Sequence, residues 1–117
     1  MMKIGILSWD AYKARNLAIA RGELQPEPSG PEVWMPSIDA VAKILSEKNR
    51  VLLRTIQEKQ PRSIAELATL VNRKQSNVSR TLKTMSRYGI AELREVGGHM
   101  KQPIALATEF QLELRHA

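Results

Sequence analysis

The sequence predicts an α+β fold that is mainly helical, and three observations support this prediction. Apolar residues recur at helical spacing through residues 37–88. After Gly89, two short segments of partly alternating character flank a pair of glycines, which is typical of a β-hairpin. Residues 23–36 contain four prolines, a composition that breaks helices. We therefore expect one small domain at residues 37–117 with an N-terminal appendage at residues 1–36.

The N-terminal appendage is expected to be a helical arm followed by a proline-rich linker. Residues 3–7 suit a short strand or an extended arm, and residues 8–22 suit a helix. Within the linker at residues 23–36, Trp34 and Met35 are apolar and are expected to dock on a surface, such as that of a second subunit. The appendage would then serve dimerisation or the binding of a protein partner.

Four helices are expected to follow the linker. The first two, at residues 37–46 and 46–60, place their apolar side chains on one side. The third, at residues 63–71, opens with a serine and a glutamate in the capping-box arrangement. The fourth, at residues 75–88, ends at Gly89, a residue that commonly terminates helices.

The last part of the chain is expected to be extended. The segments "IAELREV" and "PIALAT" flank "GGHMKQ", so they predict a hairpin with a glycine-rich tip, and the tail at residues 109–117 is a last strand or a short helix. A helix of about nine residues, a three-residue turn and a longer basic helix form a helix-turn-helix. With the hairpin as a wing, the predicted architecture is a winged helix-turn-helix: a three-helix core plus a β-hairpin.

Positive charge is concentrated on the fourth predicted helix and the turn before it. The chain has 18 basic and 12 acidic side chains, with a pI near 10. Residues 73–88 hold five basic side chains and no acidic one, whereas the rest of the chain holds 13 basic and 12 acidic side chains. Nearly all of the net charge therefore lies on one short segment, which favours a polyanionic partner.

One side of this helix is apolar and the other is polar or basic. Val78, Leu82 and Met85 have helical spacing and are expected to pack against the preceding helix. Its opposite side is then exposed and rigidly held, as a helix that enters the major groove of double-stranded DNA must be. The candidate DNA-binding residues on the turn, the helix and the wing are Arg73, Lys74, Gln75, Ser76, Asn77, Ser79, Arg80, Lys83, Arg87, His99 and Lys101.

Position along the helix suggests a role for each candidate. Five polar or basic residues near the helix N-terminus are expected to reach base edges: Gln75, Ser76, Asn77, Ser79 and Arg80. Gln and Asn suit adenine, and Arg suits guanine. Lys83 and Arg87 lie further along and are expected to contact phosphates. The two basic residues of the turn would grip the DNA backbone, and the wing tip would approach a neighbouring phosphate or the minor groove.

The segment "SIAELATLVNRKQSNVSRTLKTMSRYGIAEL", followed by a glycine-containing hairpin, resembles the winged helix-turn-helix of MarR-like transcriptional regulators. With the "LSEKNRVLLRTI" helix, the resemblance covers about residues 37–107. It extends to small predicted DNA-binding proteins, some of them antitoxin-like. The resemblance implies a homodimer that binds a palindromic operator and often represses its own promoter. This chain lacks the long C-terminal helices that form the MarR dimer interface, so a dimer must use the N-terminal arm, residues 37–45 or the tail.

Composition and motifs exclude several other classes. The chain has no cysteine, hence no disulfide, thiolate metal site or cysteine nucleophile. His99 and His116 lack a second ligand at metal-binding spacing, and no phosphate-loop motif follows the glycine pair. No apolar run is long enough to span a bilayer. We therefore expect a cytoplasmic protein that is not an enzyme, with no metal, no other cofactor and no membrane contact.

Other interpretations of the same features stay open at this stage. A basic segment also occurs on helices whose charged face only meets solvent. A winged helix also serves as a protein-interaction module that does not touch DNA. In the alternative function, the chain is an antitoxin-like protein or an adaptor whose residues 1–36 bind a protein partner, such as a toxin, and DNA binding serves autoregulation or is absent.

Overall fold

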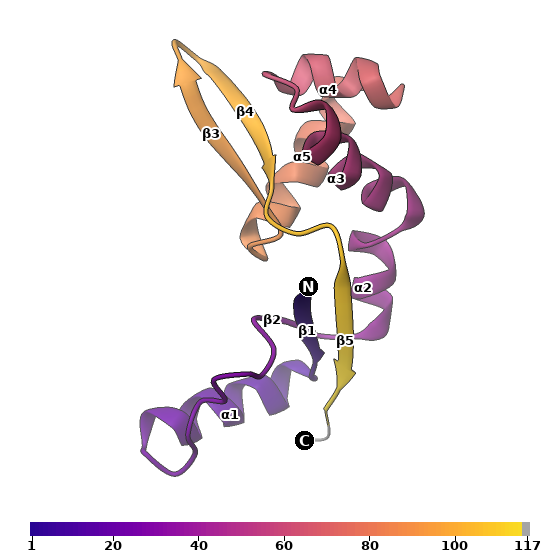
Figure 1. Cartoon of the computed structure of the whole chain (residues 1–117). Helices are drawn as coiled ribbons and strands as arrows, with labels where there is room; N and C mark the ends of the chain where they lie inside the picture. Colours follow the sequence, from indigo (N-terminus) through magenta and orange to yellow (C-terminus); the bar gives the residue numbers. More distant parts are fainter. Residues whose placement is uncertain (116–117) are drawn as a thin grey trace. The chain divides into compact units, whose positions relative to one another are not determined.

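The chain forms two compact units (Figure 1). The structure is a computed structural model that describes residues 1–115, so His116 lies outside the described residues. The sheet unit comprises Met1–Ala42 together with the chain from Glu109 onward. The helical unit comprises Lys43–Thr108.

Helices and strands together give the α+β class that the sequence predicts. The sheet unit contains β1 (Met2–Ile6), α1 (Trp9–Ala20), β2 (Val33–Met35) and β5 (Phe110–Leu114). Helix α2 (Ile38–Ile44) begins in the sheet unit and ends in the helical unit. The helical unit continues with α3 (Glu47–Lys59), α4 (Ile64–Val71), α5 (Gln75–Arg87), β3 (Ala91–Gly97) and β4 (Met100–Ala105). Over the described range, no helix is both long enough and apolar enough to cross a lipid bilayer.

The sheet unit is built on three parallel strands in the order β2-β1-β5. Ile4 pairs with Val33 on one side and with Leu112 on the other, so these three side chains share one face of the sheet. On the same face, Ile4, Ile6, Val33 and Met35 are buried. This row of aliphatic side chains forms the core of the unit.

The opposite face of the sheet carries Trp34 above Gly5. A Cβ atom on Gly5 would overlap the Trp34 ring, so the close approach requires glycine. The guanidinium carbons of Arg15 and Arg115 lie 4.7 Å and 5.8 Å from the centre of the ring, at cation–π distance. Arg115 also donates two hydrogen bonds to the carboxylate of Glu27, at 2.9 Å and 2.7 Å. These contacts anchor the proline-rich segment to the sheet.

The positions of Trp34 and Met35 differ from the expected ones. The sequence places both in a linker that docks on another surface, whereas the structure places both in β2. Met35 is only 1% exposed, and Trp34 is half-buried. Because the chain itself covers Met35 and contacts both faces of this strand, these two residues are not a free docking segment.

The sheet also changes the predicted organisation of the chain. The expected linker contains β2, and the tail, for which the sequence allows a strand or a helix, is β5. Because β1 pairs with both, the N-terminal region is part of a compact unit and not a separate arm. The sheet unit therefore takes residues 37–42 and the tail from the predicted domain at residues 37–117.

Helices α3, α4 and α5 form the centre of the helical unit, and the first two begin at a serine cap. The Ser46 hydroxyl accepts a hydrogen bond from the backbone N–H of Asn49 at the start of α3. The Ser63 hydroxyl accepts one from the N–H of Glu66 at the start of α4, and the Glu66 carboxylate accepts one from the N–H of Arg62. The three helices bury aliphatic side chains against one another: Leu52, Leu53, Ile56, Leu67, Val78, Leu82 and Met85.

Strands β3 and β4 form the expected antiparallel hairpin (Figure 1). Ala91 pairs with Ala105 at its base, and the strands turn at Gly98, which has a φ of 56° that favours glycine. The tip is shorter than the predicted segment at residues 97–102, because β4 already begins at Met100. A register shift near Glu95 marks a β-bulge beside the tip.

Candidate nucleic-acid interface

Helices α4 and α5 are joined by the predicted three-residue turn. Asn72 ends α4 in the left-handed conformation with a φ of 55°, and the N–H of Arg73 bonds back to the carbonyl of Ala68 at 3.0 Å. Lys74 then takes the N-cap position of α5, where no side chain caps the helix. The first N–H groups of α5 therefore have no side-chain acceptor, an arrangement that suits an anion.

The apolar side of α5 is fully covered. Val78, Leu82 and Met85 are each 0% exposed. Their spacing fixes the orientation of the helix, and the opposite side is left to solvent. The exposed side chains in and just before α5 are Lys74, Gln75, Ser76, Asn77, Arg80, Lys83, Ser86 and Arg87; Ser79, also a candidate, is half-buried.

The cations on α5 have no acidic partner in the described part of the chain. The three salt bridges within residues 1–115 join Arg94 to Glu92, Arg115 to Glu27, and Arg115 to Glu113. Arg80, Lys83 and Arg87 take part in none of them. Their charges are therefore neutralised only by solvent and counterions, which leaves the exposed side of α5 with a positive potential.

Arg73 does not have the free side chain that the sequence suggests for it. Its Nε donates to the Oδ1 of Asn77 and its Nη1 to the Oδ1 of Asn49, both at 3.0 Å. Its Nη2 donates to the hydroxyl of Thr81 at 3.2 Å. The guanidinium thus links α3, the turn and two successive turns of α5, and it holds α5 in place from within the protein.

The same contacts alter the expected role of Asn77. Its carbonyl oxygen accepts hydrogen bonds from two nitrogens of Arg73, so this oxygen is occupied. A bidentate contact with adenine would need that oxygen as well as the amide nitrogen. The sequence contains a sign of this arrangement, because Arg73, Asn77 and Thr81 follow one another at four-residue spacing, which aligns them along one side of a helix.

A hollow beside α5 is lined by one further basic residue, Lys43, which local sequence patterns do not mark as a candidate. It is lined by Lys43 and Ile44 at the end of α2, by Asn49 of α3, and by residues of α5 that include Arg80 and Thr84. Lys43 is exposed, so the basic surface extends from α5 toward the end of α2. No local pattern indicates this, because 37 positions separate Lys43 from Arg80 along the chain.

The hairpin contributes less charge than α5. His99 and Lys101 are exposed at the tip, as predicted, but Lys101 lies directly across the ladder from Glu95. Arg94 forms a salt bridge of 3.3 Å with Glu92 on the same strand. The two basic side chains of the hairpin are thus balanced by two acidic ones. The attraction of the helical unit for an anion therefore comes mainly from α5 and little from the hairpin.

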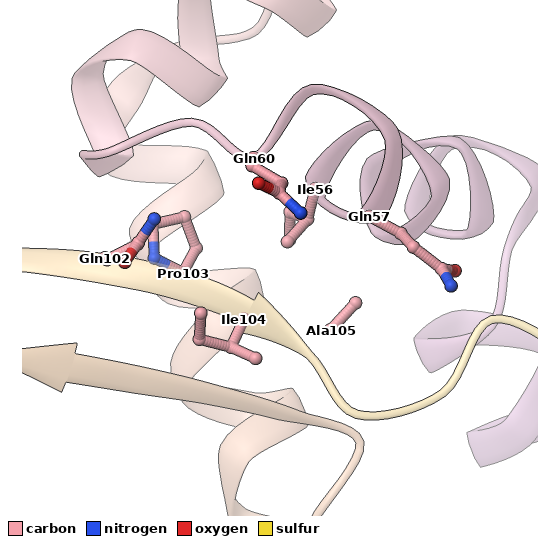
Figure 2. Close-up of a pocket in the computed structure, with 7 residues that line it drawn as sticks. All are labelled: Ile56, Gln57, Gln60, Gln102, Pro103, Ile104 and Ala105. Carbon is pink, nitrogen blue, oxygen red and sulfur yellow. The ribbon is translucent and has the colours of Figure 1, made fainter.

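A second hollow lies between the end of α3 and strand β4 (Figure 2). Three glutamine side chains line it together with apolar groups: Gln57, Gln60 and Gln102, with Ile56, Pro103, Ile104 and Ala105. The amide of Gln102 donates to the carbonyl of Pro61 at 3.4 Å. The lining contains no ionisable side chain, so this hollow offers amides and apolar contacts but no acid, base or nucleophile.

Comparison with family models assigns the helical unit to a family. The HVO_A0114 family model matches residues 44–112, which is more than half of the chain. The chain belongs to the HVO_A0114 family. The HVO_A0114 match runs from the end of α2 into β5 and includes all eleven candidate residues, from Arg73 to Lys101. No curated protein and no solved structure matches the chain.

Proposed function

We propose that the helical unit is a winged helix-turn-helix that binds double-stranded DNA in a sequence-specific manner and regulates transcription. One observation carries the proposal: α5 is held by three fully buried aliphatic side chains, and its exposed side is basic and free of acid. A helix of this kind can enter the major groove without losing its own packing.

The arrangement around α5 supports the same proposal. An eight-residue helix, a three-residue turn and a 13-residue helix have the proportions of a helix-turn-helix. The antiparallel hairpin follows α5 directly, as a wing follows a recognition helix. The resemblance to MarR-like regulators implies the same use of these elements.

Three groups of residues divide the work on DNA. Gln75, Ser76 and Arg80 are exposed in the first half of α5 and contact base edges, where Arg80 suits guanine. Lys83 and Arg87, exposed further along, contact phosphates. The third group, which includes Arg73 and Asn77, acts through hydrogen bonds within the protein: Arg73 joins Asn77 of α5 to Asn49 of α3 and so fixes the direction of α5.

The functional state is a homodimer on a palindromic operator. One winged helix covers only roughly 600–1,000 Å² of protein surface on DNA, and a single α5 meets few base pairs. A two-fold symmetric dimer doubles both quantities and demands two half-sites in opposite directions, about one helical turn apart. A repressor that blocks its own promoter is the regulatory form that the MarR resemblance implies.

The alternative, an adaptor or antitoxin-like protein that binds a partner through residues 1–36, has lost the feature that favoured it. That feature was a free segment carrying Trp34 and Met35, and both residues lie in β2. We therefore favour DNA binding over the binding of a protein partner through residues 1–36.

Selection of bound sequences from a random DNA pool, by the full chain at physiological salt, tests the proposal. We expect a two-fold symmetric consensus. Recovery of no enriched sequence, together with no binding at low salt, would reject it.

Three variants then separate the roles on the selected site. Arg80→Ala should weaken binding to the consensus by roughly 1–3 kcal/mol and affect a scrambled duplex much less. Lys83→Ala should weaken both duplexes alike, because phosphates carry no sequence information. Arg54→Ala is the matched control: Arg54 is exposed on α3, away from the buried Leu53 and Ile56, and its loss should change neither affinity much. Equal losses on both duplexes for Arg80→Ala would reject its contact with bases.

A further inference from the structure

Strand β5 lies at an edge of the parallel sheet. It pairs with β1 alone among the strands of residues 1–115 (Figure 1). The carbonyl of Glu109 accepts from the N–H of Met2 at 3.0 Å, and the N–H of Arg115 donates to the carbonyl of Ile6 at 3.1 Å. Alternate residues of a strand direct these groups to opposite sides, so residues 109, 111, 113 and 115 face β1. The backbone groups of Phe110, Leu112 and Leu114 therefore point to the outer edge.

The two edges of this sheet differ in their protection. The other edge strand, β2, has only three residues, and Pro31 and Pro36 lie just beyond its ends. Short strands and flanking prolines are the usual means of keeping an edge from pairing with another chain. Strand β5 has five residues, "FQLEL", with neither proline nor lysine. It is the edge that is open to a further strand.

The open edge also carries exposed apolar side chains. Leu112 is 49% exposed and Leu114 is 67% exposed. Their partners in the register, Ile4 and Ile6, are 0% and 7% exposed on the same face. The apolar face of the sheet thus continues past its buried centre and stops, uncovered, at β5.

We propose that β5 is the dimerisation strand, and that it pairs antiparallel with β5 of a second copy of this chain about a two-fold axis at Leu112. The sequence of the strand matches itself in this register. Leu112 meets its own copy, Phe110 meets Leu114, and Gln111 meets Glu113, whose carboxylate an amide can bond. The outward backbone groups of Phe110, Leu112 and Leu114 form hydrogen-bonded pairs, as an antiparallel ladder requires.

Other registers fail on the same grounds. An axis at Gln111 would oppose Glu113 to Glu109, and an axis at Glu113 would oppose that residue to itself, so like charges would meet in both. Both would also require outward backbone groups from residues that already bond to β1. An axis at Phe110 or Leu114 would overlap only part of the strand.

This proposal rests on the proposed function, which requires a second copy of the chain. The β5 pairing supplies that second copy. Two three-stranded sheets become one continuous sheet of six strands, and the contact is isologous, so assembly closes at two copies. Each dimer then contains two copies of α5, the number that a palindrome with two half-sites requires.

A cysteine at the axis tests the register directly, since the chain has no cysteine of its own. In a hydrogen-bonded antiparallel pair the two Cα atoms lie about 5.5 Å apart, within the range of a disulfide. Mild oxidation of Leu112→Cys should therefore give a covalent dimer in high yield. Leu17→Cys, at a position on α1 that is 55% exposed, is the matched control, and its two chains should stay largely without a disulfide crosslink. Equal crosslinking of the two variants, or none of Leu112→Cys, would overturn the pairing.

A charge at the axis tests the dimer without a crosslink. Leu112→Lys puts two ammonium groups face to face and should convert the dimer to a monomer in light scattering, whereas Leu17→Lys should remain a dimer. An equimolar mixture of Leu112→Lys and Leu112→Glu should restore the dimer. A Leu112→Lys variant that stays folded by circular dichroism and remains dimeric would reject the proposal.

Failure of the dimer and failure of DNA binding are distinguishable. If the pairing holds, Leu112→Lys should bind a single half-site as well as the natural chain does, and should lose roughly 10²–10⁴ in affinity for the full palindrome. A covalent Leu112→Cys dimer that binds no duplex would support the pairing and reject the proposed function. A monomeric natural chain that binds DNA would do the reverse.

Discussion

The sheet unit and the helical unit of this chain differ in charge far more than in size. The sheet unit holds five basic and seven acidic side chains, whereas the helical unit holds 13 basic and five acidic. The chain's net charge of +6 therefore conceals a helical unit at +8 beside a sheet unit at −2. The net charge of the whole chain therefore understates the attraction of the helical unit for a polyanion.

The two units also differ in how completely they bury their apolar side chains. Helix α5 of the helical unit buries its entire apolar side, with Val78, Leu82 and Met85 at 0% exposure. The edge strand of the sheet unit leaves Leu112 and Leu114 about half or more exposed. The helical unit thus exposes charged side chains over a fully buried core, whereas the sheet unit exposes apolar side chains at its edge. This difference is consistent with the proposed division between DNA contact and self-association.

The largest expected effect is that of salt on the affinity for DNA, because salt screens the charge of the helical unit and leaves the apolar edge of the sheet unit unaffected. With about 6–10 phosphate contacts per dimer, the affinity for DNA should fall roughly 10³–10⁵-fold between 50 and 200 mM salt. Fluorescence anisotropy of a labelled duplex measures this slope, and light scattering over the same range should show an unchanged dimer. A flat response of the DNA affinity would contradict an electrostatic role for α5.

The core beneath α5 should give the next largest effect. Leu82→Ala leaves a cavity at a residue that is 0% exposed, so the free energy of unfolding should fall by roughly 2–5 kcal/mol. Lys83→Ala, at the exposed neighbouring position, should change it by less than about 0.5 kcal/mol. Urea titration of both variants checks the pair. Similar losses for the two would mean that α5 is not anchored as described.

Arg73 and Lys74 form a natural pair of variants, because they are adjacent and carry the same charge. Arg73→Ala removes hydrogen bonds to Asn49, Asn77 and Thr81 and should cost roughly 1–3 kcal/mol in unfolding free energy. Lys74→Ala should leave stability nearly unchanged and weaken DNA binding at every sequence. If Arg73→Ala unfolded at the same urea concentration as the natural chain, the positioning role of Arg73 would be excluded.

The smallest effect should come from acid on the sheet unit. The hydrogen bond from Arg115 lowers the pKa of Glu27 below its ordinary value of 4.5. A depressed pKa in the folded state means that the stabilisation is present above pH 4.5 and is lost as the pH falls through the lower folded value. Thermal unfolding from neutral to acidic pH should show a small loss that Glu27→Gln reduces. Because Glu27 is exposed, a steep loss assigned to it would contradict a surface pair.

Most of the helical unit could be predicted from the sequence. The capping box at Ser63, the three-residue turn and the buried stripe of α5 all lie where local spacing predicts them. The exposure of Arg80 and Lys83 follows from that stripe. These features depend on residues within one or two helical turns, and such interactions can be read from a short stretch of chain.

The sheet unit could not be predicted in the same way. Strand β2 is short and stands among prolines, so its composition is that of a linker. Its identity as a strand depends on β1, and that of β5 depends on a partner at the opposite end of the chain. Local composition therefore predicts a docking segment at Trp34 and Met35, where the structure has part of a sheet.

Local sequence patterns indicate which segments become helices, where those helices begin and end to within a few residues, and which side of α5 carries charge. Three further features depend on the folded chain: Arg73 donates hydrogen bonds to Asn49 and Asn77, Lys43 joins the basic surface, and β5 is an open edge. The physical reason is range. Helical hydrogen bonds and caps connect residues three or four positions apart, whereas strand pairing and side-chain networks connect residues that only the folded chain brings together.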